Sequence, residues 1–313
     1  MEQVRAAVVQ AAPVPFDVGA TLERVRELAT EAAGQGVQLA VFPEAFVGGY
    51  PKGSSFGAVV GHRSDEGRED FQRYFEGSVE VPGPAVEELS QIAAEHALHL
   101  VVGVIERGGG TLYCTVVFVG PDGGYLGKHR KLMPTAAERL VWGFGDGSTM
   151  PVLETALGRI GAVICWENYM PAMRLAMYSK GIEIYCAPTA DSRRPHASTM
   201  QHIALEGRCF VLAANQFTRR ADFPEDYENL FGEDPETIIS SGGSCIVSPF
   251  GRFLAGPVYD ESTLLVADLD MNDIKKGKYD FDVVGHYARP DVFHLDVNEA
   301  PMSPVSHRKD PSG

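Results

Sequence analysis

The 313-residue chain has few basic residues relative to acidic ones and no long hydrophobic run. Lys and Arg together number 27 against 42 Asp and Glu, so the formal net charge is −15. Nucleic acids and anionic membrane surfaces attract basic proteins, and we therefore expect neither as a partner of this chain. No stretch of about 18 or more apolar residues occurs, so the sequence predicts no membrane span.

Cysteine is also scarce, and its arrangement excludes two kinds of site. The cysteines are odd in number and widely spaced, with no Cys-x-x-Cys pair, which argues against a disulfide framework and a cysteine-rich zinc site. The histidines have no metal-ligand spacing either, and we expect no metal ion. Because residues 1–10 lack the pattern of a signal peptide, we expect a cytoplasmic protein with reduced thiols. The five cysteines are Cys114, Cys165, Cys186, Cys209 and Cys245.

The composition is otherwise that of a globular protein, with 44% hydrophobic and 22% charged residues. Apolar runs typical of strands alternate with segments of helical periodicity. This order predicts a mixed α/β sheet whose strands are buried on both faces and covered by helices. We expect strands at residues 4–10, 37–42, 100–105, 112–119, 125–130, 160–165, 182–187, 209–214, 243–247, 252–255 and 264–269, and helices at 20–33, 84–98, 171–179 and 198–207.

Three segments lack a clear pattern of this kind. Residues 48–77 are rich in glycine and charge, and residues 217–235 are acidic; we expect both to be long loops. Residues 297–313 combine three prolines with several charges, and we expect a flexible tail there. No composition shift divides the rest, so residues 1–296 are predicted to form one domain.

Cys165 is the first candidate for chemistry. It follows the apolar run 160–164 and precedes the helix expected at 171–179. A strand-to-helix turn exposes a side chain at the edge of a sheet, where nucleophiles lie in other α/β enzymes. A buried and inert thiol is the alternative reading of a single cysteine.

A nucleophilic cysteine needs a base and a stabilising charge. None of the nine histidines lies in a segment typical of a cysteine-protease partner. Glu44 ends the apolar run 37–42 and is flanked by proline and aromatic residues, which favours a raised pKa and proton transfer. Lys131 follows the strand expected at 125–130 and offers a positive charge. All three residues lie at strand ends, and we expect them to meet in one crevice.

These segments resemble those of the nitrilase superfamily of carbon–nitrogen hydrolases over about residues 6–297. The matching segments are FPEAF at 42–46, HRKLMPT at 129–135 and CWENYMP at 165–171. The resemblance implies that Glu44, Lys131 and Cys165 are catalytic and that Glu138 is the family's additional glutamate. It also implies a four-layer α-β-β-α sandwich and self-association into layered dimers that can extend into spirals.

Further residues point to one branch of this superfamily. Trp166, Glu167 and Asn168 follow the cysteine as in true nitrilases, whereas amidase-like branches usually have Tyr or Phe and then Asp. Segments 48–51, 141–148 and 285–291 are also similar to nitrilase segments. We expect Tyr50, Trp166 and His196 to bind substrate; His196 stands where many nitrilases have tryptophan.

The implied reaction is hydrolysis of an organic nitrile to a carboxylic acid and ammonia. The intermediates would be a thioimidate and then a thioester on Cys165, and no cofactor is required. A cyanide-converting enzyme or an amidase of the same superfamily remains an alternative, as does a hydrolase with a Cys–His pair. A non-enzymatic filament or binding protein is a further alternative, although such a protein should have lost one of the three catalytic residues.

Overall fold

Two β-sheets form the centre of the molecule. The computed structural model describes residues 2–228, 230–303 and 305. The first sheet has the strand order β15-β1-β2-β5-β6-β7, with β1 parallel to β2, β2 parallel to β5, and the other pairs antiparallel. Its strands are β1 (Gln3–Gln10), β2 (Leu39–Val41), β5 (His99–Gly108), β6 (Thr111–Val119), β7 (Tyr125–Arg130) and β15 (Thr263–Asp270).

The second sheet has seven strands, in the order β12-β13-β11-β10-β9-β8, with β14 also paired to β13. Its central strands β9, β10 and β11 are parallel, and the outer pairs are antiparallel. The strands are β8 (Val152–Thr155), β9 (Gly158–Ala162), β10 (Ile184–Thr189), β11 (Phe210–Asn215), β12 (Phe217–Arg219), β13 (Ile238–Val247) and β14 (Phe253–Tyr259).

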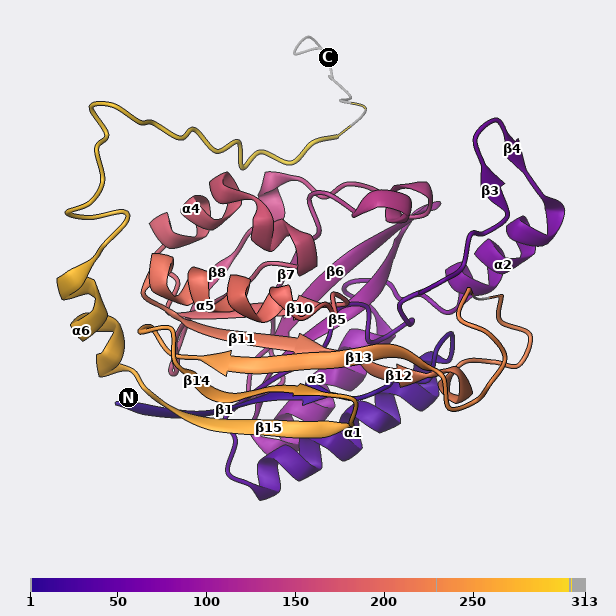
Figure 1. The fold of residues 1–313 in the computed structure, drawn as a ribbon, viewed down its shortest axis with the longest axis horizontal. Helices are drawn as coiled ribbons and strands as arrows, with labels where there is room; N and C mark the ends of the chain where they lie inside the picture. The colour runs from indigo at the N-terminus through magenta and orange to yellow at the C-terminus, as the bar shows by residue number, and fades with distance from the viewer. Residues whose placement is uncertain (1, 229, 304, 306–313) are drawn as a thin grey trace, which may run out of the picture.

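Helices cover one face of each sheet, and the two remaining faces pack against each other. Successive side chains of a strand point to opposite faces. Thus Ala7 and Val9 of β1 contact the helices, whereas Ala6 and Val8 enter the layer between the sheets. The result is a four-layer α-β-β-α sandwich (Figure 1). Helices α1 (Val18–Gly34) and α3 (Pro84–His96) cover the first sheet, and α4 (Pro171–Ser179) and α5 (Pro195–Gly207) cover the second.

The predicted four-layer sandwich is therefore confirmed, but the expectation of a single mixed sheet covered by helices was wrong. The apolar runs of the strands are buried on both sides, as expected. Burial on the second side comes from the other sheet, as in the contact of Val41 and Ile105 with the cluster that includes Ile184 and Leu212. Apolar periodicity reports burial of a strand and carries no information about whether a helix or a sheet provides it.

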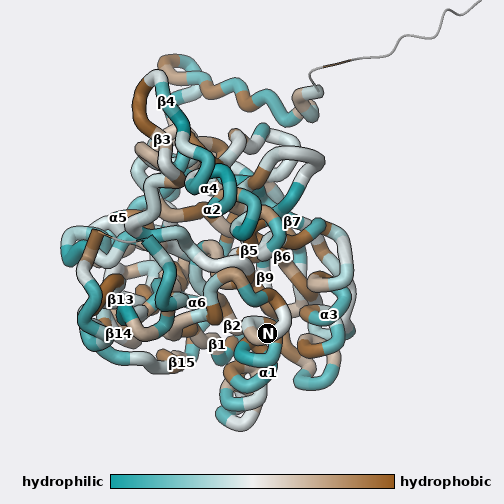
Figure 2. The backbone as a smooth tube through the Cα atoms, turned by 90° about the vertical axis from the view of Figure 1, so that its right-hand side faces the viewer, coloured by the Kyte–Doolittle hydropathy of each residue, from teal (hydrophilic) through white to brown (hydrophobic). Residues whose placement is uncertain are grey.

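The segment 48–77 was expected to be a loop, yet half of it is regular. It contains the hairpin strands β3 (Ala58–Val59) and β4 (His62–Arg63) and helix α2 (Asp65–Glu76), which project from one end of the sandwich (Figures 1 and 2). Ser64 caps the helix by accepting a hydrogen bond from the Gly67 N–H. Only two residues of the helix are fully buried, yet Phe71, Tyr74 and Phe75 form a short apolar stripe at helical spacing. The charge and glycine of the surrounding segment led to the expectation of a loop.

The remainder of the chain adds one helix and two long irregular segments. Helix α6 (Asn272–Asp280) was not predicted, because it too is mostly polar. The described residues between 220 and 237 contain one short 3-10 turn as their only regular element, and Phe223 and Tyr227 pack there with Ile239 and Phe16. No helix in the described part of the chain is both long and apolar enough to cross a bilayer.

The C-terminal segment after α6 has no helix or strand in its described part. Residues 297–303 contact the body of the protein: the Met302 N–H donates to Asp146, and Glu299 lies 2.5 Å from the Lys180 ammonium. Residues 304 and 306–313 of the predicted flexible tail lie outside the described residues.

Candidate active site

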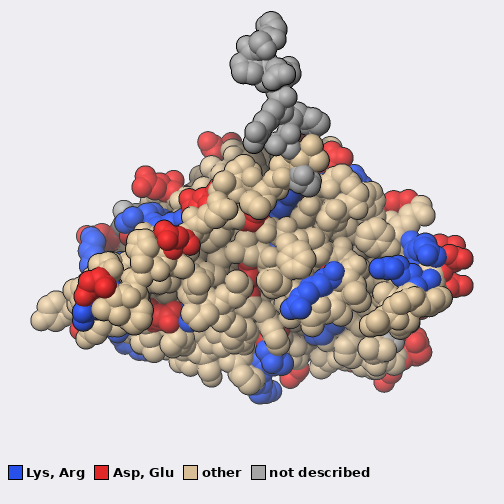
Figure 3. Space-filling view, turned by 90° about the horizontal axis from the view of Figure 1, so that it is seen from above, with Lys and Arg blue, Asp and Glu red and all other residues tan. Residues whose placement is uncertain are grey.

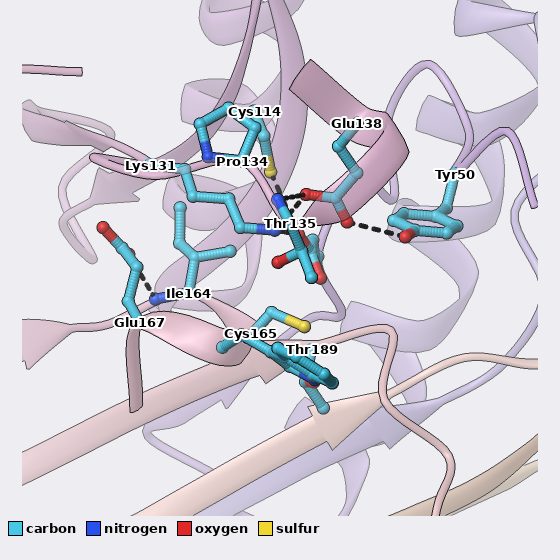
Figure 4. A network of polar contacts seen from close by, with 12 residues as sticks. Tyr50, Cys114, Lys131, Pro134, Thr135, Glu138, Ile164, Cys165, Glu167 and Thr189 are labelled. Carbon is cyan, nitrogen blue, oxygen red and sulfur yellow. Dashed lines mark hydrogen bonds and ion pairs between the residues drawn. The ribbon is translucent and has the colours of Figure 1, made fainter. Parts of the chain in front are cut away.

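Both sheets contribute to one buried cluster of polar side chains. Glu44 lies three residues after β2 and Lys131 directly follows β7, so both come from the first sheet. Cys165 lies three residues after β9 of the second sheet and begins the 3-10 helix Cys165–Tyr169. All three side chains are buried, and the charges of Glu44 and Lys131 act on the thiol of Cys165. Figure 4 shows Lys131 and Cys165 in this cluster. The three residues predicted to meet in one crevice are thus brought together.

The Lys131 ammonium is held between two carboxylates. Its Nζ lies 2.6 Å from Oε1 of Glu44 and 2.7 Å from Oε2 of Glu138. The Tyr50 hydroxyl donates to Oε1 of Glu138 at 2.6 Å, at the edge of the cluster. Charge-assisted hydrogen bonds of this length are strong in a buried environment. With both carboxylates ionised, the cluster carries one more negative charge than positive charge.

Burial and charge set the protonation states of the cluster. Burial raises the pKa of Glu44, although the charge of Lys131 acts in the opposite direction. Burial also raises the pKa of the Cys165 thiol, and the Glu44 carboxylate raises it further. For Lys131, burial alone would lower the pKa, but the surrounding negative charges, Glu44 first, hold it well above its ordinary value. The cluster therefore combines a charged lysine, a protonated thiol and a carboxylate of increased basicity.

Local backbone structure fixes Glu138 and Cys165. Glu138 lies in the 3-10 helix Ala136–Leu140, where its Oε2 also accepts the Thr135 N–H at 2.6 Å. Cys165 has φ of +52°, a left-handed conformation that a residue with a Cβ rarely adopts. Cys165 was expected to close this strand, but strand β9 ends three residues earlier, at Ala162. Such strain persists only where the surrounding structure holds it, and it is frequent at functional sites.

Two neighbours of Glu44 were not identified from the sequence. The Cys114 thiol in β6 donates to Oε1 of Glu44 at 3.4 Å, and the Gln216 side chain donates to the Glu44 carbonyl at 2.9 Å. The second oxygen of Glu44, Oε2, has no hydrogen-bond partner among the described residues and is free to accept a proton. Cys114 and Gln216 are far from Glu44 in sequence, and no local pattern indicates this contact.

A cavity of about 490 Å3 opens beside the cluster. Tyr50 and Glu138 line it, as do apolar residues such as Phe56 and Leu140. Lys52 also lines the cavity, and burial lowers the pKa of its ammonium group. Of the residues expected to bind substrate, Tyr50 therefore lies at the cavity wall and next to the catalytic candidates.

Trp166 and His196 lie outside the lining of this cavity. The Trp166 indole N–H donates to Asp191 at 2.9 Å, and the Arg193 guanidinium stacks on its ring. His196 is buried 3.9 Å from Asp191, and neither ring nitrogen has a hydrogen-bond partner in the described part of the chain. A role of these two residues in substrate binding stays a prediction.

A metal ion or a polyanion would require other groupings of side chains. The described residues contain no group of three or more His, Cys, Asp or Glu side chains arranged to hold a metal ion. Acidic and basic side chains alternate over the face seen in Figure 3, without a continuous basic stripe there.

Comparisons with known proteins show the family and the fold of the chain. The family model of carbon–nitrogen hydrolases matches residues 5–279. An aliphatic nitrilase from Sinorhizobium fredii is 59% identical over 98% of this chain and 100% of its own length. A bifunctional nitrilase/nitrile hydratase from Nicotiana tabacum is 58% identical over 97% of this chain and 88% of its own. Among solved structures, an amidase from Nesterenkonia sp. superposes with a TM-score of 0.64 at 23% identity, over 87% of this chain and 92% of its own.

Proposed function

Because the chain belongs to the carbon–nitrogen hydrolase family, we propose that it is a nitrilase that converts an organic nitrile and two water molecules into a carboxylic acid and ammonia. One observation carries the proposal: the ammonium of Lys131 is held between Glu44 and Glu138, and both carboxylates and the ammonium act on the thiol of Cys165. Of this cluster, Glu138 lines the neighbouring cavity. Relatives named as nitrilases are 53–59% identical over nearly the whole chain, which supports it.

The first half of the reaction forms a covalent bond between Cys165 and the nitrile carbon. Glu44 takes the thiol proton through its free oxygen, and the thiolate attacks the carbon of the C≡N group. The nitrogen gains the proton, which gives a thioimidate. The raised pKa of Glu44 suits this step, since a base with a pKa nearer the working pH transfers protons more efficiently.

The second half releases ammonia and then the acid. Glu44 activates a water molecule, which adds to the thioimidate carbon to give a tetrahedral intermediate. The C–N bond breaks, the nitrogen leaves as ammonia, and a thioester remains. A second water hydrolyses the thioester and restores the thiol. Lys131, together with backbone N–H groups after Cys165, stabilises charge in the tetrahedral states, and Glu138 positions Lys131.

An amide is the alternative product of the tetrahedral intermediate. If the C–S bond breaks before the C–N bond, the thiolate leaves and the amide is released. Some similar relatives are named bifunctional nitrilase/nitrile hydratase, so both products should be measured. For this chain we propose the acid as the main product, because relatives that are 53–59% identical are named nitrilases.

The remaining features of the proposal concern organisation. We assign residues 1–296 to the catalytic domain and residues 297–313 to a C-terminal tail. The five free thiols fit a reducing compartment, and we assign the protein to the cytoplasm.

We also propose that the protein self-associates, because large apolar side chains are exposed on β3, on residues 230–231 and on the C-terminal segment around Phe293. A single monomeric species in light scattering would contradict this.

The proposal is tested by ammonia release from a nitrile panel, with Cys165→Ala in parallel. The panel contains an aliphatic dinitrile, benzonitrile, phenylacetonitrile, mandelonitrile and cyanide, and the products are identified as acid, amide or formamide. We expect ammonia and acid from the wild type and neither from the variant. Turnover of the matching amides without turnover of any nitrile would instead assign the protein to the amidases, and formamide from cyanide alone to the cyanide-converting enzymes.

A further inference from the structure

A single buried carboxylate connects the backbone beside Lys131 to the backbone beside Cys165. Oε1 of Glu167 accepts the N–H of Leu132 at 2.6 Å. Oε2 accepts the N–H of Ile164 at 2.9 Å (Figure 4). Leu132 directly follows the lysine and Ile164 directly precedes the cysteine. Because these two residues come from different sheets, the Glu167 side chain bridges the two halves of the sandwich at the site.

This bridge lies where the backbone most needs support. Cys165 adopts the left-handed conformation described above, and Asn168 holds the other side of the same turn by donating to the Cys165 carbonyl at 2.7 Å. Loss of the Ile164 hydrogen bond would leave a buried N–H without a partner, which favours a shift of the turn. A shift of about 1 Å in a reacting group can lower a rate by about 100-fold.

His129 provides the counter-charge for Glu167. Its Nε2 lies 2.9 Å from Oε2 of Glu167, and its Nδ1 lies 2.6 Å from the carbonyl oxygen of Thr149. Both atoms that face the ring nitrogens are hydrogen-bond acceptors. One is the carbonyl oxygen of Thr149, and the other is an oxygen of the ionised Glu167 carboxylate, which already accepts two backbone N–H groups. A neutral imidazole has one N–H and satisfies only one acceptor, whereas the imidazolium form satisfies both. His129 is therefore charged in this arrangement.

The other charges near this pair do not compete with it. Burial lowers the pKa of His129, but the charge and hydrogen bond of Glu167, together with the Thr149 carbonyl, outweigh burial and raise it. The charge of Lys180 also lowers this pKa, and it ranks behind these causes. Lys180 itself donates to the Met150 carbonyl and pairs with Glu299. The neighbours of His129 on strand β7, Lys128 and Arg130, both point to Glu106. The Glu167–His129 pair is thus neutral as a unit and fully buried.

We propose that the Glu167–His129 ion pair is a positioning device that fixes Cys165 relative to Lys131 and so sets the rate of attack on the substrate. The proposal deepens the function proposed above and rests on it for the identity of the substrate. Neither residue touches the reacting atoms: Glu167 acts through the backbone amides of Leu132 and Ile164, and His129 acts through Glu167.

The first test is Glu167→Gln, with Glu106→Gln as the matched control. Glu106 is also a buried carboxylate paired with residues of β7, but it contacts neither Leu132 nor Ile164. A glutamine amide at position 167 has only one acceptor oxygen, so one of the two backbone N–H groups loses its partner. We expect kcat for the best nitrile to fall about 10- to 100-fold in Glu167→Gln with KM changed little. Glu106→Gln should lose stability and keep kcat.

The second test is His129→Gln, which covers the case in which Glu167→Gln does not fold. It removes the positive charge and leaves the Glu167 carboxylate uncompensated. An additional negative charge near Cys165 disfavours the thiolate. The rate of Cys165 alkylation by iodoacetamide, corrected with Cys165→Ala, is measured as a function of pH. We expect the profile of His129→Gln to move to higher pH than that of the wild type, and that of Glu106→Gln to stay in place.

The proposal is overturned if the loss of the ion pair affects stability alone. If Glu167→Gln and His129→Gln keep the wild-type kcat and alkylation profile, and lose only thermal stability as Glu106→Gln does, the pair is structural. The alkylation measurement requires no substrate. A wild type that hydrolyses no nitrile would therefore contradict the proposed function while the test of the ion pair could still be completed.

Discussion

Two buried ion-pair clusters lie on either side of the end of strand β7, and they differ in the ratio of their charges. In the first, one carboxylate, Glu106, accepts hydrogen bonds from Lys128, Arg130 and Thr115. In the second, one ammonium, Lys131, is shared by the carboxylates of Glu44 and Glu138. The cations of the two clusters, Lys128 and Arg130 in the first and Lys131 in the second, lie one to three positions apart in sequence, yet the clusters have opposite ratios of charge.

The pKa shifts of Glu106 and Glu44 have opposite directions, in line with this difference in charge. Burial acts to raise the pKa of Glu106, but the hydrogen bonds from Arg130 and Lys128 outweigh it and hold the pKa below its usual value. Burial raises the pKa of Glu44, and a single lysine shared with Glu138 does not reverse the shift. A carboxylate surrounded by donors is a stable anion and a poor base. A carboxylate that has too few donors takes up a proton readily, which is the property that catalysis needs.

The largest contrast is expected in activity. Glu44→Gln removes the base and should lower the rate of nitrile hydrolysis by about 10²- to 10⁴-fold. Glu106→Gln removes an equally buried carboxylate and should leave the rate nearly unchanged in the folded protein. Steady-state ammonia release from both variants checks this. Comparable losses in the two variants would show that the two clusters are not functionally different.

The next contrast is in stability, because its dependence on pH should have opposite signs for the carboxylates of the two clusters. Glu106→Gln leaves the half-buried Lys128 and Arg130 without their buried carboxylate, so it should lower the free energy of unfolding by up to about 3 kcal/mol. Because the pKa of Glu106 is lowered in the folded state, its contribution is present above the unfolded value of about 4.3 and is lost as the pH falls through the folded value. Thermal unfolding of the wild type and Glu106→Gln should therefore converge in acid.

Glu44 should behave in the opposite way in the same experiment. Its pKa is raised in the folded state, so its contribution is present at low pH and is lost as the pH rises through the folded value. Glu44→Gln also removes the first of the charges that compensate the buried Lys131 ammonium, but Glu138 still pairs with that ammonium. The variant should therefore lose less stability at pH 8 than Glu106→Gln, at the cost of activity. A loss of stability at pH 8 as large as that of Glu106→Gln would contradict the assignment of Glu44 as the disfavoured anion.

A smaller effect is expected for the second carboxylate of the catalytic cluster. Glu138→Gln keeps the size of the side chain but removes one of the two charges on Lys131. The altered position of the ammonium should lower kcat about 10- to 100-fold, while KM rises modestly because the Tyr50 contact at the cavity wall also changes. Separate determination of kcat and KM checks this. An unchanged kcat would remove Glu138 from the mechanism.

The smallest effect concerns the cavity itself. Lys52 lines it without a hydrogen bond or ion pair from its side chain among the described residues. An ammonium group at that place should favour a nitrile with a carboxylate at its far end over a neutral nitrile of equal length. Lys52→Met should reduce this preference by up to about 10-fold, the size of one exposed charge contact. Equal ratios of kcat/KM for the two substrates in both proteins would exclude such a contact.

The sequence predicted the parts of the site that follow strands. Glu44 and Cys165 each stand just after an apolar run, and the ends of such runs are visible in the order of the residues. Lys131 follows the mostly polar strand β7, so the resemblance of segment 129–135 indicated its role more strongly than periodicity did. The Cys114 and Gln216 contacts with Glu44 could not be predicted, because they depend on how β6 and β11 approach β2 in space. Helix α2 was missed although Phe71, Tyr74 and Phe75 form a short apolar stripe, because the segment around it is rich in charge and glycine.

The central claim is that Cys165 forms a covalent intermediate with the nitrile. The most direct measurement is the intact mass of the protein, taken after an acid quench during turnover of the best nitrile, followed by peptide mapping. The account predicts an added thioimidate or acyl group on Cys165 in the wild type, and no addition in Cys165→Ala. Release of ammonia and acid with no adduct on Cys165, or with the adduct on Cys114, would contradict it.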